Sequence, residues 1–278
     1  MKSIFTSLVI LVLLLTSVFA SLSVVVSIPP LGYATQYIGG KSVNVDILVK
    51  AGDNPHNYSL SPQQVMKISK MTAFIDLGLT EDEWIAQRVK AISPNIKVFN
   101  STNGMSHLLI GTNGSYNPHV WLDVKLYELM CINIYDDLVK LDPGDREKFS
   151  YNLGNLLIKL NDLDDKIREE LKPFHGKPFV AQHPAWVYFA RAYDLGKEYS
   201  LMNDSGQTVG PREYQKIVES MKRYKIGSII GDPVTPVKIA YSLSKDTDAE
   251  IVEINPIYTT DYFKLMTTVS EKFVEAFR

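Results

Sequence analysis

The sequence contains little cysteine and no excess of charge of either sign. Only one of its 278 residues is a cysteine, Cys131, so no disulfide can form within the chain. Its 29 basic residues nearly balance its 31 acidic residues, and the formal net charge is -2. A chain without a basic patch or stripe lacks the electrostatic footprint of a nucleic-acid-binding protein. These two shortages exclude an internally disulfide-bonded scaffold and disfavour DNA or RNA as a partner.

Motifs of the common hydrolases and nucleotide-binding enzymes are also missing. The sequence has no His-Glu-x-x-His segment, no Gly-x-Ser-x-Gly segment and no glycine-rich phosphate loop. The chain is nevertheless long enough, with 45% hydrophobic residues, to bury a substantial core and to form two domains. The composition therefore indicates a globular protein and disfavours an enzyme of these classes.

The long apolar run lies at the N-terminus. Lys2 supplies a positive charge, residues 4–19 are almost unbroken in their apolar character, and Val18-Phe19-Ala20 suits a signal peptidase. We interpret residues 1–20 as a signal peptide, with the mature chain beginning near Ser21. The alternative is an uncleaved membrane anchor, because the run approaches the lower limit of about 17 residues for a spanning helix. No cysteine follows the run, so a lipid has no acceptor there.

The rest of the chain alternates between strand-like and helix-like segments. The expected strands are short, β-branched and apolar, and they comprise residues 22–28, 43–49, 73–77, 96–99, 177–180, 198–201, 227–230 and 250–254. Helical patterns separate most of these strands. One helix has a clearly marked start: Ser61 can cap it, Pro62 suits its first position, and Gln64 completes a capping box. Such alternation predicts parallel sheets with right-handed crossovers and helices on both faces.

One helix between the two halves is much longer than the others. Its apolar stripe extends from Phe149 to Leu171, after a start at 142–145, and Pro173 ends it. At 1.5 Å per residue this helix is about 40 Å long, so we interpret it as a spine. The predicted fold class is α/β, with two parallel-sheet α/β lobes joined by one long rigid α-helix. The predicted domains are a signal peptide (1–20), an N-terminal lobe (21–141), a linker helix (142–174) and a C-terminal lobe (175–278).

Three of the five histidines stand in related local sequences. His56 and His119 each follow Asn-Pro, whereas His183 lies between Gln182 and Pro184. Each precedes a helical pattern, and the loop of His56 follows a strand, where ligands of parallel sheets bind. Neutral imidazoles on stiff loops suit a borderline-soft cation such as zinc. Our hypothesis is that these three loops converge. The other two histidines, His107 and His175, are interpreted as surface residues.

Several segments together resemble the solute-binding component of zinc and manganese ABC uptake systems. This family includes periplasmic metal-binding proteins and metal-binding adhesins, and the resemblance extends from about Val24 to the C-terminus. The segments that carry it are Gly52–Gln64 with its Pro-His-x-Tyr core, Asn117–Asp123, Gln182-His183 followed by Tyr188-Phe189-Ala190 and Tyr193, and the long helix.

The resemblance implies a metal site between the lobes, with ligands at the positions of His56, His119 and His183. A histidine at the third position favours zinc, with manganese as the alternative. The family's fourth ligand is an aspartate just after the last strand, but this chain has Asn255 there, in a shortened loop that leads to Asp261.

The charge of the metal ion also favours a carboxylate among its ligands. Three neutral imidazoles leave the +2 charge uncompensated, so we expect Asp261 as a direct or water-bridged ligand. Asn255 or a water molecule remains an alternative for the fourth position. Asp123 and Asp232 are candidates for orienting the imidazoles from behind.

The resemblance further implies a function outside the cytoplasm, in the periplasm or at the outer face of the cytoplasmic membrane. We expect a monomer that captures zinc and delivers it to an ABC transporter permease, and that meets the membrane only through this permease or an uncleaved N-terminus. Two alternatives remain: a zinc-dependent hydrolase, because zinc with an open position activates water, and a metal-binding surface adhesin. Four Asn-x-Ser/Thr segments of this chain match the acceptor pattern for glycosylation, a short pattern that also arises by chance.

Overall fold

Two four-stranded parallel sheets form the framework of the molecule. The computed structural model describes residues 21–53, 58–112, 115–203, 206–234 and 238–278. The strand orders are β2-β1-β3-β4 and β10-β9-β7-β8. The first sheet contains β1 (Leu22–Val26), β2 (Val43–Ile47), β3 (Ala73–Asp76) and β4 (Lys97–Asn100). The second contains β7 (Phe179–Ala181), β8 (Glu198–Ser200), β9 (Ser228–Gly231) and β10 (Glu250–Glu253). The predicted fold class is confirmed, whereas the expected signal peptide lies outside the described residues.

Helices cover both sheets, as the alternating pattern predicts. In the first lobe these are α1 (Pro29–Gly39), α2 (Pro62–Ile68), α3 (Thr80–Ile92) and α4 (Val124–Leu141). In the second they are α6 (Val187–Ala192), α7 (Pro211–Tyr224), α8 (Lys238–Thr247) and α9 (Tyr262–Phe277). The predicted capping box at the start of α2 is present: the Ser61 side chain accepts from Gln64 N, and the Gln64 side chain accepts from Ser61 N. Among the described residues, no helix has both the length and the apolar surface needed to cross a bilayer.

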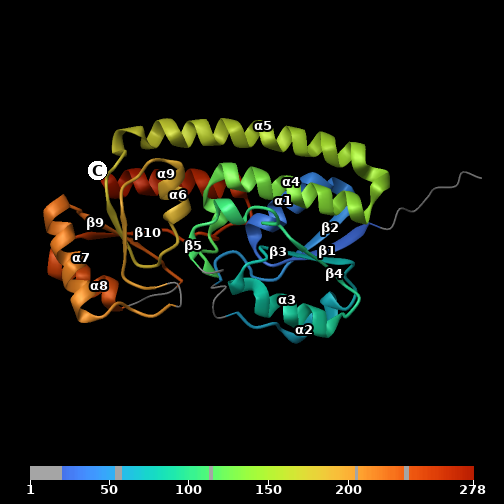
Figure 1. The fold of residues 1–278 in the computed structure, drawn as a ribbon, viewed down its shortest axis with the longest axis horizontal. Coiled ribbons are helices and arrows are strands. Elements are labelled where there is room, and N and C mark those ends of the chain that lie inside the picture. The colour runs from blue at the N-terminus through green and yellow to red at the C-terminus, as the bar shows by residue number, and fades with distance from the viewer. Residues whose placement is uncertain (1–20, 54–57, 113–114, 204–205, 235–237) are drawn as a thin grey trace, which may run out of the picture.

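The long helix α5 (Arg146–Leu171) lies along both lobes (Figure 1). Its 26 residues correspond to about 39 Å at 1.5 Å per residue. One face of α5 is buried against α4, α1 and α9, as the apolar stripe predicts. α5 therefore connects the lobes along their length, while the exact lobe boundaries stay a prediction.

The hydrophobic core is continuous from one lobe to the other. Buried side chains of the first sheet, such as Phe74, belong to the same cluster as Phe179 and Phe273 of the second lobe. A separate, smaller cluster lies under α7 and α8 and includes Leu201 and Ile217. A shared core resists relative motion of the lobes, because separating them exposes apolar surface to water.

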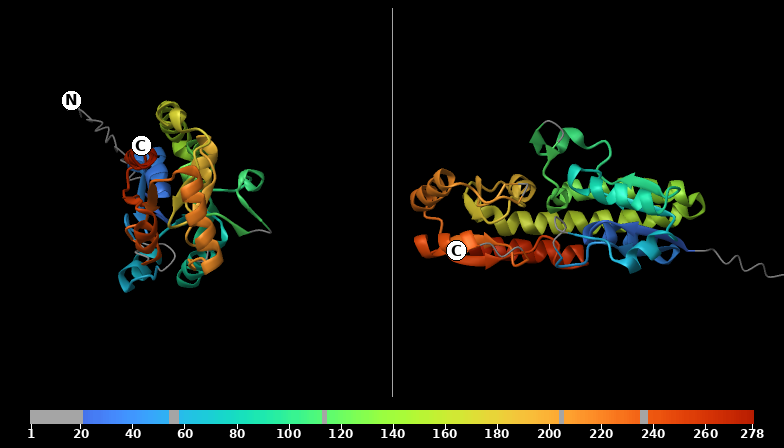
Figure 2. Two further views of the ribbon diagram at one scale, coloured as in Figure 1. Left: turned by 90° about the vertical axis from the view of Figure 1, so that its left-hand side faces the viewer. Right: turned by 90° about the horizontal axis from the view of Figure 1, so that it is seen from below.

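The segment between β4 and α4 contains a short antiparallel hairpin. Its strands are β5 (Gly111–Thr112) and β6 (Ser115–Tyr116). Gly111 has φ of 155°, and a Cβ atom there would overlap the carbonyl oxygen of Ser115, so the close approach requires glycine. The hairpin lies between the lobes in Figure 1 and projects from the body in both views of Figure 2. It leads directly into the loop that carries His119.

Candidate metal centre

His183 follows the carboxyl end of β7, one of the two central strands of the second sheet. The preceding residue, Gln182, still extends the sheet, since its N–H donates to the carbonyl of Ile230 at 2.7 Å. The chain then turns sharply, with Ala185 N donating to His183 O at 2.8 Å, before α6 begins. A strand end and a tight turn therefore hold the backbone of His183 in place, at the edge where parallel sheets bind ligands.

His119 lies between the hairpin and the start of α4. Its side chain is 3% exposed. The following residues form a 3-10 turn, Val120–Leu122, in which Leu122 N donates to His119 O at 3.1 Å. Asp123 then caps α4, because its Oδ1 accepts from Lys125 N and Leu126 N at 3.0 and 3.2 Å. His119 is thus held on a short, hydrogen-bonded connection, as the sequence predicts.

The structure brings His119 and His183 together from opposite lobes. Their Nε2 atoms are 3.4 Å apart, and their rings are inclined at 74°. Two nitrogens bound to one tetrahedral zinc, each about 2.0–2.1 Å from the ion, are separated by about 3.3–3.4 Å. The pair therefore has the nitrogen–nitrogen spacing that one zinc ion requires from two of its ligands.

Hydrogen bonds between the lobes surround this pair. Trp121 Nε1 donates to Pro256 O at 3.0 Å, and Tyr262 OH donates to Trp121 O at 2.7 Å. Gly52, just before the segment with His56, donates its N–H to Ile257 O at 3.0 Å. The loops from both lobes are therefore fixed to each other around the two imidazoles.

The hairpin side of the site is linked to α6. Tyr188 OH donates to Asn117 O at 3.0 Å and accepts from Ile110 N at 2.9 Å. Arg191, one turn further along α6, donates to Leu108 O at 2.8 Å. The sequence analysis named Tyr188 only as part of the resemblance and did not name Arg191. Their spacing of three residues, which places both on one helix face, was the available signal for these supporting contacts.

The side-chain contacts of Asp123 within the described residues are with the start of α4 and with Arg191. Besides capping α4, its Oδ2 lies 3.5 Å from the Arg191 guanidinium. Burial raises the pKa of its carboxyl, opposed by the hydrogen bond from Leu126 N and by the charge of Arg191. Instead, Asn117 supplies the atom near the second imidazole nitrogen of His119, with Oδ1 and Nδ1 3.0 Å apart.

The other predicted site residues are His56, Asp261, Asn255 and Asp232. His56 lies outside the described residues. Asp261 is exposed and caps α9, with its Oδ1 accepting from Lys264 N at 3.1 Å. Asn255 Oδ1 accepts from Ile257 N at 2.8 Å, and Asp232 lines a cavity of about 10 Å³ together with His183. No group of three His, Cys, Asp or Glu residues suited to a metal occurs within the described ranges. The third and fourth ligands therefore stay predictions.

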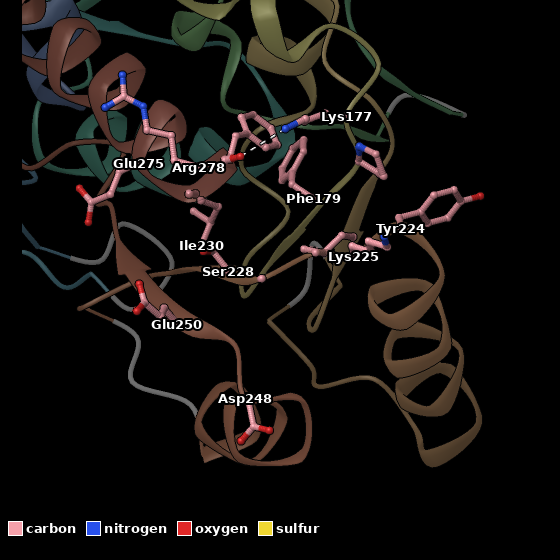
Figure 3. Close-up of a pocket in the computed structure, with 15 residues that line it drawn as sticks. Lys177, Phe179, Tyr224, Lys225, Ser228, Ile230, Asp248, Glu250, Glu275 and Arg278 are labelled. Carbon is pink, nitrogen blue, oxygen red and sulfur yellow. Dashed lines mark hydrogen bonds between the residues drawn. The ribbon is translucent and has the colours of Figure 1, made fainter.

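A larger cavity, of about 480 Å³, lies at the opposite edge of the second sheet (Figure 3). It is lined by the amino ends of β7, β9 and β10 and by the end of α9. Charges of both signs surround it: Lys177, Lys225, Arg278, Asp248, Glu250 and Glu275. The described residues of the lining include none of the three candidate histidines, so this cavity does not match the predicted metal site.

Comparisons with known proteins agree with this architecture. The crystal structure of ZnuA superimposes with a TM-score of 0.85 and 27% identity, covering 92% of this chain and 99% of that one. A ZnuA deletion mutant with zinc bound matches with a TM-score of 0.84. The laminin-binding protein of Streptococcus agalactiae, at 24% identity, shares the fold with a TM-score of 0.82. The two-lobed architecture is therefore one that this chain shares with ZnuA, including its zinc-bound mutant.

The family assignment follows from the sequence comparison. The family model described as "Zinc-uptake complex component A periplasmic" matches residues 24–276, and the chain belongs to this family. A metal ABC transporter substrate-binding lipoprotein of Lactococcus lactis is 26% identical over 250 residues, covering 86% of this chain and 78% of the relative. The zinc-binding lipoprotein AdcA of Streptococcus pneumoniae is 27% identical over 255 residues. The chain spans about half the length of AdcA, 50%.

Proposed function

We propose that this chain is an extracytoplasmic solute-binding protein that captures zinc and delivers it to the permease of an ABC transporter. The observation that carries the proposal is the 3.4 Å separation between His119 Nε2 and His183 Nε2. Family membership supports the transport role, because the matching family model is described as the periplasmic component A of a zinc-uptake complex. The zinc is cargo in this proposal, bound between the lobes and later released.

Zinc is favoured over manganese by the donor atoms. Imidazole nitrogens suit zinc, whereas manganese prefers a site dominated by carboxylate, carbonyl and water oxygens. The zinc-bound ZnuA mutant supports this choice, and a manganese-bound periplasmic protein with the same fold makes manganese the competing cargo. In the proposed site, His56 and Asp261 complete the coordination by His119 and His183, and Asp261 compensates part of the charge of the ion.

The proposal assigns the chain a binding role and no enzymatic turnover. The shared core and the long α5 favour small, local changes on binding over a wide hinge motion. The permease would then recognise the rearranged loops around the ion. We also propose that the chain acts as a monomer, and that it meets the membrane through the permease or an uncleaved N-terminus.

Calorimetric titration of residues 21–278 with zinc and with manganese tests this function. We expect one zinc per chain, tighter than manganese, and no hydrolysis in a screen of ester, peptide and phosphate substrates. Tighter binding of manganese would refute the choice of cargo. A chain that retains neither metal would refute the function itself, and zinc-dependent turnover would support the hydrolase instead.

A further inference from the structure

The Asn117 side chain connects the loops that carry the two histidines of the candidate site. Asn117 is buried, with 7% of its surface exposed. The amide oxygen Oδ1 accepts from His119 N at 3.1 Å and lies 3.0 Å from His119 Nδ1. The amide nitrogen Nδ2 donates to Pro184 O at 2.6 Å, in the residue that follows His183. One amide group therefore contacts the ligand loops of both lobes.

These contacts determine which way round the Asn117 amide lies. The backbone N–H of His119 can only donate, so the atom facing it must be the oxygen. The Pro184 carbonyl can only accept, so the atom facing it must be the nitrogen. Turning the amide over would place donor against donor at one end and acceptor against acceptor at the other. The two ends thus fix the orientation independently.

The orientation of the amide in turn determines the tautomer of His119. Since Asn117 Oδ1 can only accept, the hydrogen bond to Nδ1 exists only when Nδ1 carries the proton. In a neutral imidazole the other nitrogen, Nε2, then carries the lone pair. That atom is the one that lies 3.4 Å from His183 Nε2. The lone pair of His119 is therefore directed to where the zinc would bind.

We propose that Asn117 is a positioning residue for metal capture: it selects the His119 tautomer that offers Nε2 to the ion, and it ties the loop of His183 to that of His119. The inference rests on the proposed function. Outer-shell partners of this kind orient imidazole ligands, and their loss typically lowers metal affinity about 10- to 100-fold. Because the partner is a neutral amide, the imidazole is less basic than with a carboxylate partner, which favours release of the cargo.

The test combines zinc affinity with a direct measurement of the tautomer. Long-range proton–nitrogen NMR of the metal-free, ¹⁵N-labelled chain at about pH 8, where an ordinary imidazole is neutral, reports which nitrogen of His119 is protonated. We expect Nδ1–H in the wild type, and a shift towards Nε2–H in Asn117→Ala with about 10- to 100-fold weaker zinc binding. Asn117→Asp keeps an acceptor and should retain the wild-type tautomer and bind zinc more tightly than Asn117→Ala.

Asn133→Ala is the matched control. The Asn133 amide likewise donates to backbone carbonyls, those of Ser101 and Asn103 at 2.8 and 3.0 Å, and neither belongs to a candidate ligand. This variant should keep the wild-type tautomer and zinc affinity. If Asn117→Ala does not fold, Asn117→Ser, with a shorter acceptor that cannot span the same contacts, is measured with the same expectation.

Two results would overturn the inference: a His119 tautomer unchanged in Asn117→Ala, or a zinc affinity equal to that of the wild type. Failure of the proposed function is distinguishable from either. If the wild type binds no zinc, the function fails, yet the metal-free NMR comparison still decides whether Asn117 sets the tautomer.

Discussion

Removal of one imidazole from the His119–His183 pair should weaken zinc binding by roughly two to three orders of magnitude. A complete protein site for structural zinc has an apparent binding free energy of about 10–16 kcal/mol near neutral pH. Divided among four ligands, this is about 2.5–4 kcal/mol for each, and about 1.4 kcal/mol corresponds to a tenfold change in affinity. The expected loss for His119→Ala or His183→Ala is therefore roughly 60- to 700-fold. The Nε2 spacing of 3.4 Å predicts a loss of this kind for both residues.

The assay is competition for zinc against a chromogenic chelator of known affinity, with the folded state of each variant checked by circular dichroism. His107→Ala and His175→Ala are matched controls, because both residues are exposed histidines outside the candidate site. The controls should bind zinc as the wild type does. Wild-type zinc affinity in either His119→Ala or His183→Ala would refute the reasoning, because it would show that the removed imidazole does not bind the ion.

Three further predictions concern stability, reactivity and pH. Tyr188→Phe removes the hydrogen bonds to Asn117 O and from Ile110 N, so the free energy of unfolding should fall by about 1–3 kcal/mol. Thermal unfolding should show a lower midpoint than in the wild type, and an unchanged midpoint would contradict this prediction. Burial raises the pKa of the Cys131 thiol, so a thiol reagent should label the chain only after unfolding, and rapid labelling of the native protein would contradict it. Zinc affinity should decrease as the pH falls below about 6.5, because protonated imidazoles have no lone pair, and should recover as the pH rises; calorimetry between pH 5 and pH 8 that shows constant affinity would exclude histidine ligation.

Elements whose signals are local could be predicted from the sequence. The start of α2 follows from Ser61, Pro62 and Gln64, whose side chains and backbone form the cap without help from the rest of the fold. The buried face of α5 likewise follows from the spacing of its apolar residues. The hairpin β5–β6 could not be predicted in this way, because strands of two residues show no periodicity and Gly111 alone does not specify a partner.

The candidate site was only partly accessible from the sequence. The positions of His119 and His183 in loops that lead into helices suggested that they converge, and the structure brings these two together. The role of Asn117 depends on contacts with Pro184, 67 residues away, which no local pattern encodes. Asp261 remains the predicted carboxylate ligand, while its hydrogen bond to Lys264 N shows the local capping role that an aspartate before a helix commonly has.

Release of the cargo must overcome an arrangement that both lobes maintain. Opening the site by a hinge would break the bonds from Trp121 to Pro256 and from Gly52 to Ile257, as well as those of Tyr188. Each such bond contributes about 0.5–1.5 kcal/mol, and the shared core adds the free energy of exposing apolar surface. A change confined to the ligand loops avoids most of these losses, because α5 and the core can stay as they are. We therefore expect the permease to act on these loops, separating the two imidazoles by the small distance at which they no longer share one ion.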